Sequence, residues 1–460
     1  MLSARTPPTA SEQHDRMTKT PIPKLVTSLA VPTVFAQLVT MIYNTADTYF
    51  VSQINESASG AVGVSFSLMA VIQAVAGGIG MGGGNLISIY LGAKKDEDAK
   101  KTASSAFFSS LLAGFLILAI GLIFLSPMMR LFGATKTILP YAVSYSRYIL
   151  FSAPFFCASF ILNNILRSEG QATLSTIGLC AGGLLNIPLD PLFIHRFEMG
   201  IAGAALATMI SQMVSFFILL VFFFRGRSVI RLHPRYISKK ASDYFLILKV
   251  GFPTICRQGM ASLSTSLLNG AAGVYGDAAV AAVTIANKIY MLVRNLIIGI
   301  GQGFQPVAGY NFGAGIRKRV KSSFAFSCLC GTVLTTVIGA LVFWRAEAVM
   351  AWFIDVPEVI EIGSLALRFA CSVMPLLAFS TLVNQLYQCL GFTVIAAILA
   401  SCRQGICFIP LILLLPAHLG LTGIQAAQPG ADLLTFLLSV PFAVLFFRKF
   451  LKRAKNNPAL

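Results

Sequence analysis

Charged residues are scarce in this chain: Asp, Glu, Lys and Arg make up only 11% of its 460 residues, against about 25% in a typical soluble domain. Hydrophobic residues make up 56%. Extended segments in which polar and apolar residues alternate are also missing, which argues against a transmembrane β-barrel. These absences exclude an ordinary soluble domain and indicate a chain whose helices lie in lipid.

Motifs for catalysis and nucleotide binding are missing too. The sequence has no GxxxxGK[ST] loop and no HExxH or GxSxG motif, so it offers neither an ATP site nor a recognisable hydrolytic centre. The glycine-rich run at 77–84 follows no strand and predicts close helix packing instead. The nine cysteines lie in or beside apolar segments, and Cys328 and Cys330 lack the further ligands that zinc needs. We expect no catalytic residues and no cofactor.

What the chain does contain is a series of apolar stretches. A transmembrane helix needs about 20 mostly apolar residues, and twelve stretches meet that requirement. They lie near residues 25–51, 59–86, 102–125, 138–163, 172–195, 200–224, 244–272, 279–309, 322–344, 361–390, 393–415 and 420–447. The predicted fold class is an all-α polytopic membrane protein with twelve transmembrane helices.

The net charge of +18 comes from Lys and Arg residues that lie mostly in alternate loops. Counted from a cytoplasmic N-terminus, the odd-numbered loops hold only four of the 35, namely Arg130, Lys136, Arg196 and Arg345. Because positive residues stay in the cytoplasm during insertion, we expect both termini there and the protein in the cell inner (plasma) membrane. The charges lie on separate loops, so we expect no nucleic-acid partner.

These features predict five parts of the chain. They are a cytoplasmic N-terminal tail at 1–24, six helices at 25–224, a cytoplasmic loop at 225–243, six helices at 244–447 and a basic cytoplasmic tail at 448–460. The N-terminal tail is polar and contains Pro7, Pro8, Pro21 and Pro23. Without an apolar core it predicts no cleavable signal peptide, and we expect it to be disordered.

The two sets of six helices repeat one another at a constant offset in the numbering, without a gap from residue 32 to residue 170. Matching pairs include Pro32/Pro253, Gln37/Gln258, Gly78/Gly299, Gly82/Gly303, Gly92/Gly313, Arg147/Arg368, Asn163/Asn384 and Gly170/Gly391. Because six is even, both halves enter the membrane from the same side. This predicts parallel repeats related by a pseudo-two-fold axis along the membrane normal, a design suited to alternating-access transport.

Charged side chains inside the membrane are costly and are usually functional or paired. The first half has two deep acids, Asp47 and Asp190, and Asn186 lies one helical turn before Asp190 on the same helix face. Two neighbouring carboxylates and an amide make a candidate site for Na⁺, and the acids alone could carry a proton. The alternative is that Asp190 forms a structural ion pair with Arg147.

Five segments resemble motifs of the multidrug and toxic compound extrusion (MATE) family, in detail those of its MepA-like bacterial branch. They are 41–52 (MIYNTADTYFVS), 164–170 (NILRSEG), 184–194 (LLNIPLDPLFI), 200–208 (GIAGAALAT) and 303–313 (GFQPVAGYNFG). The resemblance implies an antiporter that exports cationic or amphipathic drugs while H⁺ or Na⁺ enters, with a small drug-like substrate and the lipid bilayer as partners. We expect a functional monomer. The alternative is a flippase of the same superfold that moves a lipid-linked substrate.

The resemblance also implies roles for single residues. The cation-coupling positions, which would also bind Na⁺, correspond to Asp47, Asn186, Asp190 and Thr208. The positions that line the drug cavity correspond to Gln37, Tyr43 and Asn163. Pro32 corresponds to the point at which the first helix bends when the ion binds.

The second half lacks the acids that another MATE branch carries on its seventh and tenth helices; the seventh-helix position is Ala261. The repeat offset places Leu268 opposite Asp47 and Leu411 opposite Asp190. Leucine neither binds a proton nor ligates an ion, so we expect coupling in the first half alone. Asp432 is the one deep acid of the second half, and we expect it to form a structural salt bridge. Its candidate partners are Arg257, Lys288, Arg294, Arg368 and Arg403.

Overall fold

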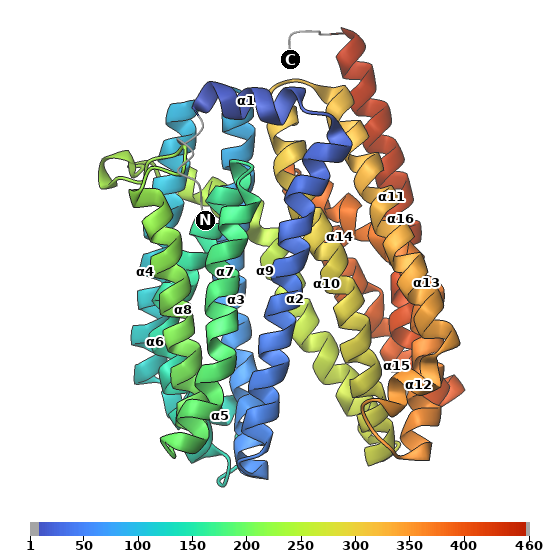
Figure 1. Ribbon diagram of the computed structural model, residues 1–460. Helices are drawn as coiled ribbons and strands as arrows, with labels where there is room; N and C mark the ends of the chain where they lie inside the picture. The colour runs from blue at the N-terminus through green and yellow to red at the C-terminus, as the bar shows by residue number, and fades with distance from the viewer. Residues whose placement is uncertain (1–8, 457–460) are drawn as a thin grey trace.

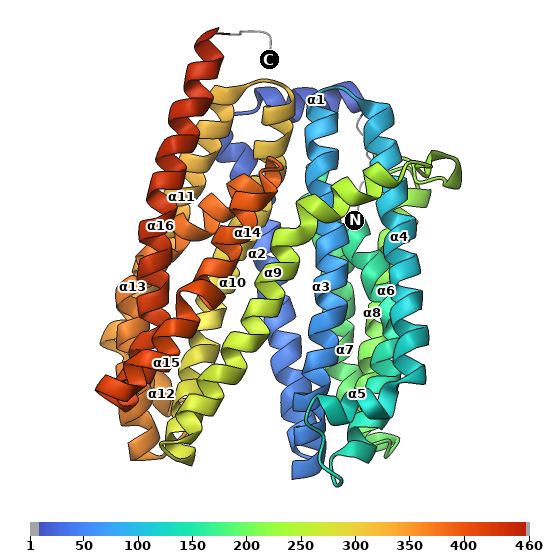
Figure 2. The same cartoon turned by 180° about the vertical axis from the view of Figure 1, so that it is seen from behind.

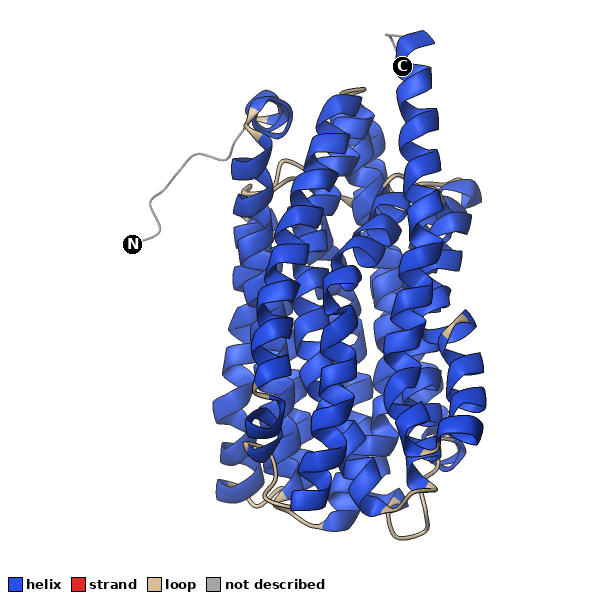
Figure 3. Ribbon diagram, turned by 90° about the vertical axis from the view of Figure 1, so that its right-hand side faces the viewer, coloured by secondary structure: helices blue, strands red, loops and turns tan. Residues whose placement is uncertain are grey.

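The computed structural model describes residues 9–456, and this part of the chain consists of helices and short connections without a β-strand (Figure 3). The α-helices are α1 (Ala10–Lys19), α2 (Ile22–Ser52), α3 (Glu56–Gly92), α4 (Asp96–Ile123), α5 (Leu125–Leu131), α6 (Leu139–Ser168), α7 (Ala172–Pro191), α8 (Ile201–Phe224), α9 (Ala241–Gly273), α10 (Asp277–Gly313), α11 (Arg317–Trp344), α12 (Ala346–Ala351), α13 (Pro357–Cys389), α14 (Thr393–Ser401), α15 (Phe408–Leu419) and α16 (Leu421–Asn456). Three shorter turns are η1 (Leu192–Arg196), η2 (Pro234–Tyr236) and η3 (Cys402–Ile406).

Within the described residues, eleven helical segments are long and apolar enough to cross a membrane. They match the predicted spans except the seventh. That span falls in α9, which is 33 residues long but carries polar side chains such as Arg257, Gln258 and Asn269. α9 still runs through the bundle beside α3 (Figure 2). The predicted all-α polytopic membrane fold is confirmed.

Both halves begin at the same end of the molecule, which we call the α1 end. α2 and α9, the first long helices of the two halves, both start there and run toward the opposite end (Figures 1 and 2). The loop between α8 and α9 and the C-terminal end of α16 lie there as well (Figure 1). This is the arrangement that parallel repeats predict.

Glycine contacts show that a single rotation relates the two halves to each other. A Cβ atom added to Gly92 would collide with the carbonyl oxygen of Tyr310, and one added to Gly313 would collide with that of Ile89. The repeat offset converts the first contact into the second. Gly78 against Ile255 and Gly299 against Val34 form another exchanged pair. Contacts that swap in this way require a pseudo-two-fold axis, and the glycines let the helix backbones approach closely there.

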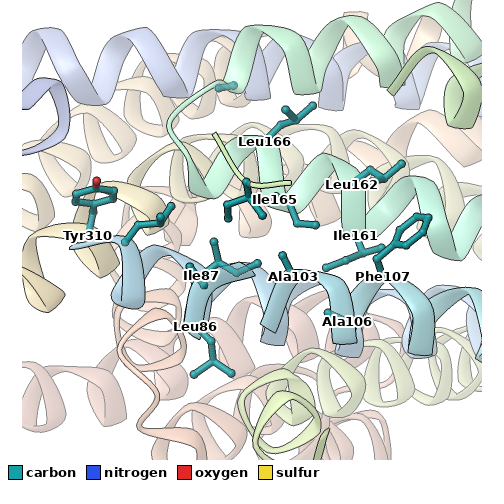
Figure 4. Packing of buried hydrophobic residues seen from close by; sticks show 14 of the residues in the cluster. Leu86, Ile87, Ala103, Ala106, Phe107, Ile161, Leu162, Ile165, Leu166 and Tyr310 are labelled. Carbon is teal, nitrogen blue, oxygen red and sulfur yellow. The ribbon is translucent and has the colours of Figure 1, made fainter. Parts of the chain in front are cut away.

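A buried hydrophobic cluster joins the two halves near the α1 end. Figure 4 shows part of it, including Ile87 of α3, Ala103 of α4, Ile165 of α6 and Tyr310 of α10. Ile247 of α9 belongs to the same cluster. Because residues from both halves share this core, the halves are packed together at that end.

The prediction that the N-terminal tail is disordered is wrong for residues 10–19, because these residues form α1. Thr9 and Glu12 form a capping box that starts the helix, and Met17 is fully buried. Gln13 Nε2 donates to the carbonyl oxygen of Glu169 in the first half, while Asn311 Nδ2 of the second half donates to that of Met17 at 3.1 Å. Pro21 and Pro23, two of the prolines of this tail, come after α1 and do not interrupt it. Residues 1–8 lie outside the described part of the chain.

The predicted C-terminal tail at 448–460 is helical where it is described, because α16 continues to Asn456. Residues 457–460 lie outside the described residues. The boundaries of the five predicted parts otherwise stay predictions.

Glu169, in the turn between α6 and α7, binds the loop that connects the halves. It has no exposed surface, and its carboxylate accepts hydrogen bonds from Ser228 Oγ at 2.7 Å, Ile230 N at 2.9 Å and Val229 N at 3.1 Å. Burial raises the pKa of Glu169 to about 7, although these hydrogen bonds oppose the shift. The buried carboxyl group of Glu169 therefore holds the start of the connecting loop, while Gln171, Ser104 and Ser105 bind other parts of the loop to the first half.

Candidate functional site

The two deep acids of the first half lie together, on α2 and α7. Asn186 Nδ2 donates to Asp190 Oδ1 at 3.1 Å, as their spacing of one helical turn predicts. Asp47 of α2 is close enough to interact electrostatically with Asp190. Arg147 is exposed and forms no ion pair with Asp190 among the described residues. The alternative of a structural Asp190–Arg147 pair is therefore wrong.

Prolines shape α7 around this pair of acids. Pro188 and Pro191 both lie inside the helix, and a π-helical turn, η1, follows directly. Proline has no N–H group, so the carbonyl oxygens of Leu184 and Ile187 lose their usual helical donors. The helix nevertheless continues through Asp190 to Pro191.

Three acceptor oxygens at this site have no hydrogen-bond partner within residues 9–456. They are Asp47 Oδ1, Asn186 Oδ1 and Asp190 Oδ2, and all are buried. The hydroxyl of Tyr145, on α6, lies 3.5 Å from Asp47 Oδ2 and donates to it. Buried polar atoms without partners are unusual, and an all-oxygen donor set suits a proton or a hard cation.

A pocket that is partly open to the outside adjoins this group of oxygens. Four of the predicted residues line it: Tyr43, Asp47, Asn186 and Thr208. Asp190 is fully buried behind them and does not line the pocket. Asn44, Met69, Ile72, Gln73, Ile149, Ser152, Phe156 and Gln212 complete the lining. The lining thus combines one acidic residue with polar, aromatic and aliphatic side chains, and it includes no basic residue.

Two of the residues predicted to line the drug cavity lie outside this pocket. Gln37 is on α2, but it is not part of the lining. Asn163 is buried and donates through Nδ2 to the carbonyl oxygen of Ser175 at 3.0 Å. Its repeat partner Asn384 donates at 2.7 Å to that of Ala396, which is the repeat counterpart of Ser175. A bond present in both halves indicates that Asn163 holds α6 against α7.

Pro32 lies inside α2, the helix that also carries Asp47, and the helix continues through it. The neighbouring hydroxyl of Thr33 lies 2.7 Å from the carbonyl oxygen of Gly299 on α10. The same helix therefore carries an acid of the site, a proline and a contact with the second half.

Sequence reasoning missed Tyr145, Gln73 and Gln212. Gln212 could have been found, because it lies one helical turn after Thr208 and shares its helix face. Tyr145 and Gln73 stand on other helices than the acids, and no spacing rule connects them to Asp47.

The second half has no comparable acid pair among the described residues. Leu268 belongs to a buried hydrophobic cluster, and Leu411 packs against it. Asp432 pairs with Arg403, whose Nε lies 2.7 Å from Oδ1. The predicted salt bridge of Asp432 is confirmed, with Arg403 as the partner among the five candidates.

Comparisons with known proteins agree with this architecture. The MatE family model matches the chain twice, over residues 32–192 and 253–414, and the two matches begin at the offset of the internal repeat. The Multidrug export protein MepA of Staphylococcus saprophyticus is 27% identical over 414 residues, which cover 90% of this chain and 91% of that protein. MepA of Staphylococcus aureus strain MSSA476 is 26% identical over the same shares.

Solved structures are similar over almost the whole chain. An outward-facing multidrug resistance MATE family transporter of the MOP superfamily has a TM-score of 0.91 at 24% identity, with 97% of this chain and 100% of that chain covered. A crystal structure of MATE in the straight conformation has a TM-score of 0.91 at 25% identity, with 96% and 99% covered. These likenesses support the fold and its two repeats.

Proposed function

The chain belongs to the MatE family and is a multi-pass membrane transporter, not an enzyme, and on this premise we propose that it exports cationic or amphipathic drug-like compounds in exchange for H⁺ or Na⁺. The multidrug export named for its MepA relatives supports the substrate class. The absence of an ATP-binding motif leaves an ion gradient as the energy source.

The group of unpartnered oxygens carries this proposal. Asp47, Asn186 and Asp190 present buried acceptors without donors, and a bound cation or proton would supply the missing partner. Asp47 and Asn186 also line the pocket, so a positively charged substrate would meet the same groups. Competition between ion and substrate for one negative site is a direct route to antiport.

The coupling step in this proposal passes through α2. A helix with an internal proline lacks one backbone hydrogen bond and bends at low cost. Bending at Pro32 would move Asp47 relative to Asp190 and would alter the packing of α2 on α10, where Thr33 meets Gly299. Occupancy of the site and the relative position of the two halves would then be linked, as alternating access requires.

The same proposal includes the membrane orientation. The basic loops predict that the α1 end faces the cytoplasm, with both termini on that side and the pocket of the first half within the membrane. We propose a monomer as the functional unit, since each chain holds a complete site.

The test is drug export from proteoliposomes with a pH gradient or a Na⁺ gradient imposed separately. Asp47→Asn and Asp190→Asn should each reduce gradient-driven export to the rate of empty vesicles, because an amide neither binds a proton nor neutralises a cation. Asp355→Asn, an exposed acid between α12 and α13, is the matched control and should export normally. Normal coupled export by a well-folded Asp47→Asn variant would remove Asp47 from the mechanism. The gradient to which the wild type responds identifies the ion.

A further inference from the structure

A second polar cluster lies in the second half. Asp432 of α16 accepts hydrogen bonds from Arg403 Nε at 2.7 Å, from Gln428 Nε2 at 3.2 Å and from the Tyr290 hydroxyl. Arg403 Nη2 in turn donates to the Tyr290 oxygen at 2.5 Å, and the guanidinium lies 5.5 Å from the centre of that ring. The single carboxylate of this cluster is therefore fully engaged, with Arg403 as its counter-charge.

Two further arginines have no such partner. Arg257 of α9 and Arg294 of α10 both interact electrostatically with Arg403, and neither forms an ion pair among the described residues. Arg294 Nε is buried and has no hydrogen-bond partner in the described part of the chain. We call Arg257, Arg294 and Arg403 the arginine cluster. It holds three guanidinium groups against the one carboxylate of Asp432.

A structural role accounts for only one of these three charges. Guanidinium groups stay protonated in proteins, and a charge inside the membrane is costly unless it is paired or serves a function. Arg403 is paired with Asp432, and Arg294 also interacts electrostatically with that carboxylate, but among the described residues neither Arg257 nor Arg294 forms an ion pair of its own. The cluster therefore carries more positive than negative charge among the described residues.

A pocket reaches this cluster through Tyr290 and Gln428, at the position that the internal repeat predicts, and the three arginines lie behind its lining residues. Leu268, Tyr290 and Ala370 line it. They are the repeat counterparts of Asp47, Met69 and Ile149, which line the pocket of the first half. Tyr290 and Gln428 line the second pocket and also bind Asp432.

Charge distinguishes the two related pockets. Arg294 is the repeat counterpart of Gln73, which lines the first pocket. Leu268 replaces the acid Asp47 at the corresponding position. Duplication followed by divergence has thus produced an acidic pocket in the first half and a pocket next to excess positive charge in the second.

We propose that the arginine cluster binds the carboxylate of a transported compound, so that the second half recognises organic anions or the negative end of zwitterions. A planar guanidinium matches a carboxylate with two parallel hydrogen bonds, and Arg294 has a buried donor free for one. This inference rests on the proposed export function and adds a substrate class to it. Ion coupling stays with the acids of the first half.

The experiment compares two substrates that differ by one negative charge. The probes are a rhodamine dye with a free benzoate carboxylate and the methyl ester of the same dye. The full chain is reconstituted in neutral phosphatidylcholine vesicles, and the ratio of acid to ester export rates is measured. Arg294→Gln installs the residue of the first-half counterpart and should lower this ratio about tenfold or more, the loss expected for one charge-assisted hydrogen bond.

Two further variants separate charge from packing. Arg294→Lys keeps the positive charge and should retain a higher ratio than Arg294→Gln. Arg130→Gln, which replaces an exposed arginine, is the matched control and should leave the ratio unchanged.

An unchanged ratio in Arg294→Gln overturns the proposal, whether both rates fall together or neither does. A wild type that exports the ester but not the acid overturns it as well. A response to Arg294→Gln only in vesicles that contain phosphatidylglycerol would mean that the arginines hold a lipid phosphate, which also overturns it. A wild type that exports neither dye refutes the proposed export function itself.

Discussion

The attachment of the connecting loop to Glu169 should weaken as pH rises, and Glu169→Gln should abolish that dependence. Glu169 lies outside the membrane-spanning segments, and burial raises its pKa from 4.5 to about 7. When the loop detaches, the carboxyl group is solvated and its pKa returns to the lower value. Between these two pH values the attached state holds more protons than the detached state, so detachment becomes easier with rising pH.

The size of the effect follows from the shift. Each pKa unit corresponds to about 1.36 kcal/mol, so the attachment should lose about 3 kcal/mol between pH 4.5 and pH 7. This contribution is complete below pH 4.5 and is lost as pH rises through 7. Such a change corresponds to roughly a hundredfold difference in the population of the detached loop.

Hydrogen exchange at the backbone amides of Val229 and Ile230 measures this equilibrium, because both amides donate to the Glu169 carboxylate. After correction for the intrinsic exchange rate, their protection in the wild type should fall roughly a hundredfold between pH 4.5 and pH 7. Glu169→Gln should give protection that does not change with pH. Glu198→Gln, which replaces an exposed glutamate, should keep the wild-type slope. A flat wild-type profile, or an unchanged slope in Glu169→Gln, would refute the reasoning.

Two further predictions concern the second half and the helix contacts. Asp432→Asn should keep gradient-driven export coupled to the ion gradient. It should lower the unfolding temperature in detergent, because breaking a buried ion pair costs about 3–5 kcal/mol. Loss of coupling in a variant with normal thermal stability would contradict this prediction. Gly92→Ala would drive a methyl group into a backbone carbonyl oxygen of α10 and should sharply reduce the yield of monodisperse protein in size-exclusion chromatography. Gly63→Ala, with nothing within 4 Å, is its control, and equal yields would disprove the close contact.

For Asn163, the role that the resemblance implies differs from the contact that the structure shows. The resemblance assigned it to a drug cavity, but in this structure its amide bonds a backbone oxygen, as that of Asn384 does in the other half. Tyr43 carries the same kind of assignment and does line the pocket. Side chains on one helix point in different directions after small rotations of that helix, and a motif does not record the rotation.

Local patterns in the sequence were sufficient for the long helices, the duplication and the shared helix face of Asn186 and Asp190. Helix length in lipid is fixed by the thickness of the membrane, so apolar stretches reveal the spans directly. The spacing of Asn186 and Asp190 places both on one face whatever surrounds them. The repeat offset could be read from glycine and proline identities alone. Both halves need these residues at the same places, because the same backbone conformations and close helix contacts occur in both.

Contacts between helices were decided by the tertiary structure. Five arginines and lysines could have paired with Asp432, and packing placed Arg403 against it. Tyr145 contacts Asp47 although the two lie on helices far apart in the sequence. Met17 is part of a hydrophobic core because α1 packs on a surface that both halves form. Such pairings depend on the tilt and rotation of whole helices, which many weak contacts set together, so no local pattern contains them.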